Sequence, residues 1–281
     1  MLESPQIALL NLHNKDFMQE KWSAKQVNFI LKLHRKGFFR TEIAKMYNKV
    51  FENKRSSNSI KNAINHYGSD IEKDLPRVLI VDIETKPMTA RVWGLFDQNI
   101  ALNQLVDEGG IFSWSAKWIG ESEVLYKDVK GNMSKEKQLL TPLWKLMDQA
   151  DIIIGQNSNK FDIKKLNSKF LEHKLGSPSE YKKVDTLVIA KRHFGFVSNK
   201  LEWMSKKFCK LKKLAHSKFP GFMLWDECGK GNVAAWKEME LYNKMDVLAT
   251  EELFVVLSEF EKNQVVTDAM RSYNAAKKGK K

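Results

Sequence analysis

The sequence has few cysteines and no long apolar run. Its two cysteines, Cys209 and Cys228, are too few for a disulfide scaffold and lack the spacing of metal ligands, which suits a reducing compartment. No apolar run is long enough to span a bilayer, and the N-terminus lacks the basic-then-apolar order of a signal peptide. We therefore expect a protein without a membrane partner that is not secreted, located in the cytoplasm or, for a virus, inside the host cell.

Acidic residues are also in deficit. The 281 residues include 47 lysines and arginines against 34 aspartates and glutamates, a formal net charge of +13. This excess attracts polyanions, of which nucleic acid is the commonest, but a basic surface kept for solubility gives the same count. Charge alone leaves the two interpretations about equal.

Three short helices are predicted between Trp22 and Gly68. Ser23 is a suitable N-cap for the first, which Gly37 would end, and Thr41 is a suitable N-cap for the second. Each segment has apolar residues on one helical face, which predicts a small all-α unit. Residues 1–20 have little pattern beyond a short helix.

This segment resembles the Myb/SANT-like helix-turn-helix domains. The resemblance rests on the opening tryptophan, the Ile43–Ala44 pair and the third-helix segment SIKNAINHYG. It implies nucleic-acid binding, because helices of this kind contact DNA. The candidate contacts are Lys54, Arg55, Lys61, Asn62 and Asn65. Three-helix units also serve as packing or protein-binding modules, and that alternative stays open.

The pattern changes after a polar linker. Strands are predicted at 77–85, 111–120, 122–129 and 151–157, the middle two forming a hairpin across Gly120. Helices are predicted at 135–150, 161–176, 184–195 and 236–264. This order indicates a mixed α/β domain. The expected organisation is a helical domain at 1–68, a linker at 69–77, the α/β domain at 78–262 and a basic tail at 263–281. The last residues of the tail, AAKKGKK, are expected to be disordered.

Four acidic residues stand out within the α/β domain. Asp82 and Glu84 end a buried strand and point to the same face, where two like charges are costly unless a cation neutralises them. Asp162 follows the next buried strand at the start of a helix, and Asp246 lies four residues after Tyr242 on one helical face. Each has an ordinary alternative: a solvated strand end, a helix cap or a surface Tyr–Asp pair.

Taken together, VDIET, NSNKFD and YNKMD resemble the three motifs of the DnaQ-like 3′→5′ exonucleases. These enzymes belong to the RNase H-like superfamily, and the tyrosine places the resemblance in the DEDDy subclass. The resemblance spans about residues 77–260 and implies a mixed β-sheet flanked by helices. Two departures leave the subfamily open: Lys86-Pro87 replaces a small residue and glycine, and the stretch from Met88 to Gly110 is unusually long.

The resemblance also implies a site for two divalent ions, Mg²⁺ or Mn²⁺. Asp82, Glu84 and Asp246 would hold the first ion, Asp82 would bridge to the second, and Asp162 would support the second. Tyr242 would mainly orient the attacking water, since an unperturbed tyrosine pKa of about 10 makes a poor base at neutral pH. The residues expected to contact the terminal nucleotide are Asn157, Phe161 and Thr85.

Other polar and aromatic residues have simpler interpretations. Asp185 is explained by helix capping. A lysine cluster could follow the phosphate backbone or form a solvated face; it comprises Lys206, Lys207, Lys210, Lys212 and Lys213. Four tryptophans are interpreted as core or packing residues rather than as stacking platforms: Trp93, Trp114, Trp118 and Trp203.

These features favour a metal-dependent 3′→5′ exonuclease, acting on DNA rather than RNA because of the N-terminal unit. Small stand-alone members of this family are common in viral and phage genomes, and proofreading would need a polymerase or replication partner in trans. The alternatives are a structure-specific endonuclease on the same fold and a DNA-binding regulator with an inert nuclease domain. The sequence does not set the oligomeric state.

Overall fold

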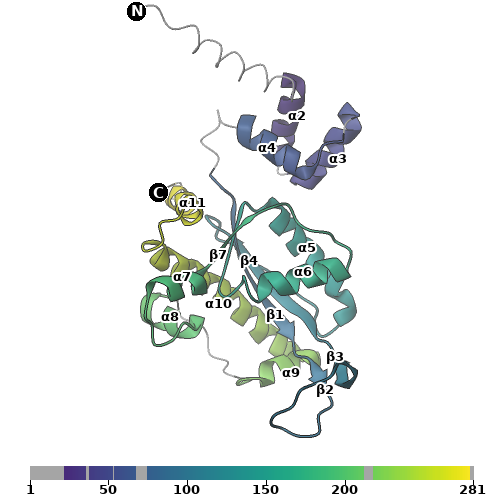
Figure 1. Cartoon of the computed structure of the whole chain (residues 1–281), viewed down its shortest axis with the longest axis vertical. Helices are drawn as coiled ribbons and strands as arrows, with labels where there is room; N and C mark the ends of the chain where they lie inside the picture. Colours follow the sequence, from purple (N-terminus) through teal and green to yellow (C-terminus); the bar gives the residue numbers. More distant parts are fainter. Residues whose placement is uncertain (1–21, 36–37, 53, 68–74, 212–217, 279–281) are drawn as a thin grey trace, which may run out of the picture. The chain divides into compact units, whose positions relative to one another are not determined.

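The computed structural model describes residues 22–35, 38–52, 54–67, 75–211 and 218–278. The described residues form two compact units that divide between Leu75 and Pro76 (Figure 1). The short helix expected within residues 1–20, the helix end at Gly37, and Lys212 and Lys213 lie outside the described residues. Among the helices that the structure describes, none combines the length and apolar character needed to cross a membrane.

The first unit is a group of three helices, as predicted: α2 (Ala24–Arg35), α3 (Arg40–Phe51) and α4 (Ser57–Tyr67). Ser23 caps α2, because its hydroxyl accepts from the Gln26 amide at 3.3 Å while the Gln26 side chain accepts from the Ser23 amide at 2.8 Å. The predicted cap at Thr41 is wrong. Helix α3 begins at Arg40, and the Glu42 carboxylate accepts from the Phe39 amide at 3.0 Å. The core of the unit comprises Trp22, Ile30, Ile43, Ala44, Tyr47, Ile60, Ala63 and Ile64.

The second unit is built on a five-stranded mixed sheet in the order β5-β4-β1-β6-β7. The central strand β1 (Val78–Lys86) pairs antiparallel with β4 (Gly110–Trp118) and parallel with β6 (Ile152–Gly155). The predicted hairpin is confirmed, since β4 pairs antiparallel with β5 (Leu125–Asp128). Strand β7 (Lys182–Asp185) was not predicted. It is short, and its first two residues are exposed lysines, so it lacks an apolar pattern.

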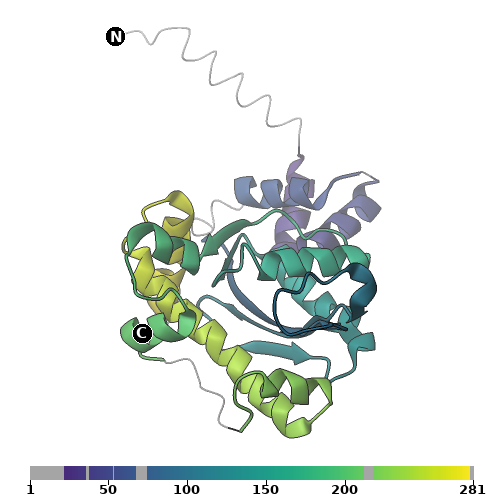
Figure 2. The same ribbon diagram turned by 60° about the horizontal axis from the view of Figure 1, so that its bottom comes forward.

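Helices cover both faces of this sheet, which explains the continuous apolar run in β1. Leu79, Val81 and Ile83 face a cluster with α5 (Glu136–Gln149) and α6 (Asp162–Glu172). Val78 and Ile80 face the opposite cluster, which includes α7 (Thr186–His193), α8 (Leu201–Phe208) and α10 (Val233–Ser258). In Figures 1 and 2, α5 and α6 lie on one side of the sheet and α10 crosses the other. Figure 1 also labels α9 (Met223–Gly229) and the short strands β2 (Thr89–Ala90) and β3 (Leu105–Asp107).

The C-terminal segment is helical as far as Lys278, so the predicted disorder of AAKKGKK is wrong for residues 275–278, and residues 279–281 lie outside the described residues. Residues Gln264–Lys278 form helix α11, capped by Asn263, whose side chain accepts from the Val266 amide at 3.0 Å. Val266 and Ala269 are buried in the same cluster as α10. The Ser272 hydroxyl also donates to the carbonyl of Pro76 at 2.7 Å. An apolar face before the basic residues therefore keeps this segment folded against the sheet domain.

Gly155 tests the packing where β6 ends beside β1. A Cβ at this position would lie 2.6 Å from the Cβ of Ser158 and 3.1 Å from the carbonyl oxygen of Val81. Because the backbone must shift to make room, we expect Gly155→Ala to lower the free energy of unfolding by roughly 1–3 kcal/mol. Gly195→Ala is the matched control, since a Cβ there meets nothing within 4 Å. Equal stability of the two variants in chemical denaturation would contradict this packing.

Candidate metal centre and active site

The first part of the site is the end of β1. Side chains alternate along a strand, so Asp82 and Glu84 project on the face opposite to Val81 and Ile83. That face is the one that α10 crosses, since α10 packs against both β1 and β4. Both carboxylates are half-buried. They therefore do not end in open solvent, as a simple strand end would.

Helix α10 supplies the third carboxylate. Its start is fixed by Asn232, whose side chain accepts from the amides of Ala234 at 2.9 Å and Ala235 at 3.4 Å. The helix buries residues around most of its circumference, among them Tyr242 and Asp246, so the surface Tyr–Asp interpretation is wrong. One carboxylate oxygen from each of Asp82, Glu84 and Asp246 lies within 4.8 Å of the others. Residues far apart in sequence thus form one acidic group.

Asp162 lies after β6, the strand that pairs with β1 in parallel. It is the first residue of α6 and is buried, and its Oδ1 accepts from the Ile83 amide at 3.1 Å. Ile83 lies between Asp82 and Glu84, so this bond ties Asp162 to the acidic part of β1. Asp162 does not act as the helix cap, which is Phe161. The pKa of Asp162 is raised to about 7, chiefly by burial and in small part by the nearby Asp185 carboxylate, against the lowering effect of the Ile83 amide.

The loop between β6 and α6 is held by Asp185. Its carboxylate accepts from the amides of Asn157 at 2.8 Å and Asn159 at 3.1 Å. It also accepts from Leu187 at 3.0 Å and caps α7, so the predicted capping role is confirmed. Asn157 adopts a left-handed backbone with φ 59°, which asparagine tolerates well. The loop leaves Phe161 39% exposed, beside the buried Asp162.

Two residues that the sequence did not reveal hold the carboxylates. Asn243 is fully buried, donates to Asp82 Oδ2 at 2.6 Å and accepts from the Ser113 hydroxyl at 3.2 Å. Its place in YNKMD, three residues before Asp246, was a usable signal. Trp225 in α9 donates from Nε1 to Glu84 Oε2 at 3.0 Å. No sequence motif marks Trp225.

Trp225 also braces the tyrosine. Its ring meets the ring of Tyr242 edge to face, with centroids 5.8 Å apart and planes at 82°. Thr85 follows Glu84 across a register irregularity in the pairing of β1 with β4. The structure therefore places every acidic residue predicted for the site, together with Tyr242 and Thr85, on or beside the end of β1.

The predicted nucleic-acid contacts lie away from this acidic group in the sequence. The exposed ones are Lys54, Asn62, Asn65, Lys206, Lys207 and Lys210. Lys61 is half-buried, and the Arg55 guanidinium lies 4.6 Å from the ring centroid of Trp22. Arg55 therefore packs on a core residue of the helical unit, and the role of the exposed residues stays a prediction.

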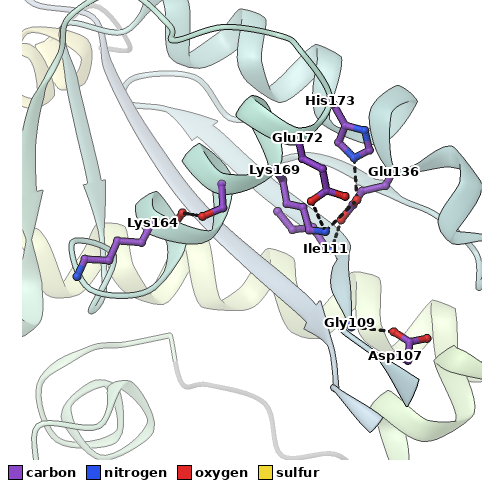
Figure 3. A network of polar contacts seen from close by, with 9 residues as sticks. Asp107, Gly109, Ile111, Glu136, Lys164, Lys169, Glu172 and His173 are labelled. Carbon is purple, nitrogen blue, oxygen red and sulfur yellow. Dashed lines mark hydrogen bonds and ion pairs between the residues drawn. The ribbon is translucent and has the colours of Figure 1, made fainter. Parts of the chain in front are cut away.

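A second acidic group lies between α5, α6 and β4 (Figure 3). Glu136 accepts from the Ile111 amide at 2.7 Å and contacts His173 Nε2 at 2.7 Å. The Lys169 ammonium lies 3.6 Å from Glu136 and 2.8 Å from Glu172, so a cation is already built into this group. Its geometry fits a polar network that joins two helices to the sheet better than it fits a metal site.

Comparison with known families agrees with this architecture. Residues 107–258 match the sequence profile of the RNase H superfamily, and the match covers more than half of the chain. The chain therefore belongs to the RNase H superfamily. Membership indicates nuclease activity on a nucleic-acid substrate with divalent metal ions. No match was found among curated proteins. The matched range includes Asp162, Tyr242 and Asp246 but begins after Asp82 and Glu84.

The raised pKa of Asp162 predicts how the metal-free protein responds to pH. The folded carboxyl holds its proton more tightly than the unfolded one, so its contribution to stability is present in acid. That contribution is lost as the pH rises from about 4 through about 7. Asp162→Asn cannot ionise and escapes this loss. In EDTA at about pH 8, we expect Asp162→Asn to have a higher Tm than the wild type, with a smaller difference at about pH 5. A wild type that is the more stable protein at the higher pH would contradict the burial of this charge.

The Trp225 bond predicts a loss of metal affinity without a loss of fold. Trp225→Phe keeps an aromatic ring against Tyr242 but cannot donate to Glu84. Loss of a residue that orients a metal ligand typically lowers the metal affinity by about 10-fold or more. We therefore expect Trp225→Phe to weaken Mn²⁺ binding by about 10-fold or more. Trp203→Phe is the control. Trp203 packs against Phe196 and Phe208, in the cluster that includes α7 and α8. Equal Mn²⁺ affinity in both variants, measured by titration calorimetry, would show that the bond does not position Glu84.

Proposed function

We propose that this chain is a metal-dependent 3′→5′ exonuclease of the DnaQ-like type, in the DEDDy subclass. The observation that carries the proposal is the convergence of Asp82, Glu84 and Asp246 within 4.8 Å. Two further features support the subclass. Asp162 is bonded to the backbone of β1, and Tyr242 lies one helical turn before Asp246.

The donor set fits a hard divalent cation. All three converging groups offer carboxylate oxygens, the ligands that Mg²⁺ and Mn²⁺ prefer. Asp82, Glu84 and Asp246 would hold one ion, and Asp82 with Asp162 would support a second. When bound, two such ions supply the Lewis acidity that activates water and stabilises charge on the attacking and leaving oxygens.

The other residues of the site position the reactants. Tyr242, braced by Trp225, directs its hydroxyl to orient the attacking water. Asn243 fixes the rotamer of Asp82, and Trp225 fixes that of Glu84. Phe161, exposed beside Asp162, offers an aromatic face to the terminal base, and Asn157 and Thr85 contact the same nucleotide.

We propose DNA as the preferred substrate because of the N-terminal unit. The first unit would be a Myb/SANT-like domain within residues 1–68, joined through a linker at 69–77 to the exonuclease domain at 78–262. Asn62 and Asn65 are exposed on α4 and Lys54 is exposed just before it, as DNA contacts require. A polymerase partner in trans and a viral or phage origin stay predictions.

A digestion experiment tests the proposal. The substrate is a 5′-labelled single strand of about 20 nucleotides, as DNA or as RNA, with Mg²⁺, Mn²⁺ or EDTA. We expect metal-dependent, stepwise shortening from the 3′ end, faster on DNA. Asp82→Asn and Asp246→Asn should each lower the rate by roughly 10³-fold, since each removes a charge that the site needs. Glu259→Gln, an exposed carboxylate at the end of α10, is the matched control.

Each part of the proposal can fail separately in this experiment. Discrete internal products would indicate an endonuclease instead. Absence of metal-dependent cleavage would indicate an inert nuclease domain. Faster shortening of RNA would contradict the DNA preference alone. Full activity in Asp82→Asn or Asp246→Asn, with normal folding, would contradict the site.

A further inference from the structure

The long stretch between β1 and β4 exposes large apolar side chains. We call residues 87–109 the arm. Trp93 is 97% exposed, Phe96 is 82% exposed and Leu95 is 89% exposed. The prediction that Trp93 packs in the core is wrong, whereas Trp114 and Trp118 are buried as expected. Among the described residues, the strands of the arm, β2 and β3, pair with each other, and its aromatic tip lies between them in the sequence.

The base of the arm is nevertheless well built. Lys86 and Asp107 form an ion pair across it, and the Arg91 amide donates to the Gln104 carbonyl at 2.9 Å. The Gln104 side chain donates to the Arg91 carbonyl at 2.9 Å and accepts from the Ala101 amide at 2.8 Å. Gly109 permits a close approach, since a Cβ there would lie 2.4 Å from the Lys86 carbonyl oxygen. The arm therefore holds its aromatic tip out on an ordered support.

The arm projects from the same end of the sheet as the acidic group. It continues β1 directly, and only Thr85, Lys86, Pro87 and Met88 separate Glu84 from the first residue of β2. At about 3.3 Å per residue, Thr89 lies at most about 17 Å along the chain from Glu84. In Figures 1 and 2 the segment leaves the end of β1, with α9 nearby in Figure 1. A strand whose terminus occupies the acidic group can reach this edge.

The composition of the arm favours bases over phosphates as its ligand. The arm has one basic residue, Arg91, and three acidic residues, Asp97, Asp107 and Glu108, of which Asp107 pairs with Lys86, so it has no net attraction for phosphate. Exposed apolar patches commonly mark binding surfaces, and tryptophan and phenylalanine stack on any base. The basic residues that give the chain its net charge of +13 lie almost entirely outside the arm and supply the general attraction for a polyanion.

We propose that the arm is a stacking platform for unpaired bases of the strand whose 3′ end enters the acidic site. Trp93 and Phe96 contact bases upstream of the scissile phosphate. The inference rests on the proposed function and deepens it. It identifies the preferred substrate as a single strand that is long enough to reach the arm. A second copy of the chain is the competing occupant of the same surface.

Kinetics on a long and a minimal substrate test the proposal. The long substrate is a single strand of about 20 nucleotides, and the minimal one is thymidine 5′-(p-nitrophenyl) phosphate, which cannot reach the arm. Trp93→Leu keeps an apolar side chain but removes the aromatic face. We expect it to raise KM for the long strand by about tenfold, with kcat unchanged and the minimal substrate unaffected. Trp93→Phe keeps an aromatic face, so its KM for the long strand should lie within about twofold of the wild-type value.

The controls separate stacking from other effects. Leu171→Ala removes a side chain that is 80% exposed on α6, and it should leave kcat and KM unchanged for both substrates. Unchanged KM for the long strand in Trp93→Leu would overturn the proposal, and so would an equal loss on both substrates. A change of oligomeric state in Trp93→Leu, measured by light scattering without any change in strand KM, would assign the arm to a second copy.

Failure of the proposed function is distinguishable from failure of this inference. If the wild type hydrolyses neither substrate, the exonuclease proposal fails, but the arm can still be tested by fluorescence anisotropy of the labelled strand without metal. Trp93→Leu should then weaken strand binding by about tenfold and Trp93→Phe should not. Equal binding by the wild type and Trp93→Leu, or no binding by either, would overturn the stacking role.

Discussion

Repulsion among the carboxylates of Asp82, Glu84 and Asp246 is the constraint on which the rest of the sheet domain depends. One oxygen from each lies within 4.8 Å of the others, a separation at which like charges repel one another. A stiff framework is needed to hold them there. Strand β1 supplies it from the centre of the sheet, hydrogen-bonded on both sides, and α10 packs across it through a largely buried surface.

The neighbouring polar bonds follow from the same constraint. Asn243 donates to Asp82 and Trp225 donates to Glu84, and each bond fixes the rotamer of the carboxylate that accepts it. One oxygen of Asp162 accepts a hydrogen bond from the Ile83 amide. Asp185 accepts from the loop that precedes Asp162 and so holds that loop in place. The group around Glu136 contains the Lys169 ammonium, which compensates part of its negative charge. That ion pairing favours a structural role for the group over metal binding.

Short-range patterns made the core of the site predictable, and long-range packing hid the remainder. The apolar run of β1 and its alternation placed Asp82 and Glu84 together, and helical spacing paired Tyr242 with Asp246. Trp225 lies 141 residues from Glu84 and meets it only because α9 packs beside α10. A tryptophan is more often a core residue than an exposed one. Trp93 is exposed because it lies between β2 and β3, which pair with each other and not with the main sheet. Lysines similarly concealed the apolar face of α11.

The most direct test of the account is the position of bound metal. A crystal soaked in Mn²⁺ and measured near the manganese absorption edge locates the ion by its anomalous scattering. We expect a peak between the carboxylates of Asp82, Glu84 and Asp246 that is absent in Asp82→Asn. A peak instead at Glu136, Glu172 and His173, or no peak at the end of β1 under conditions that support cleavage, would contradict it.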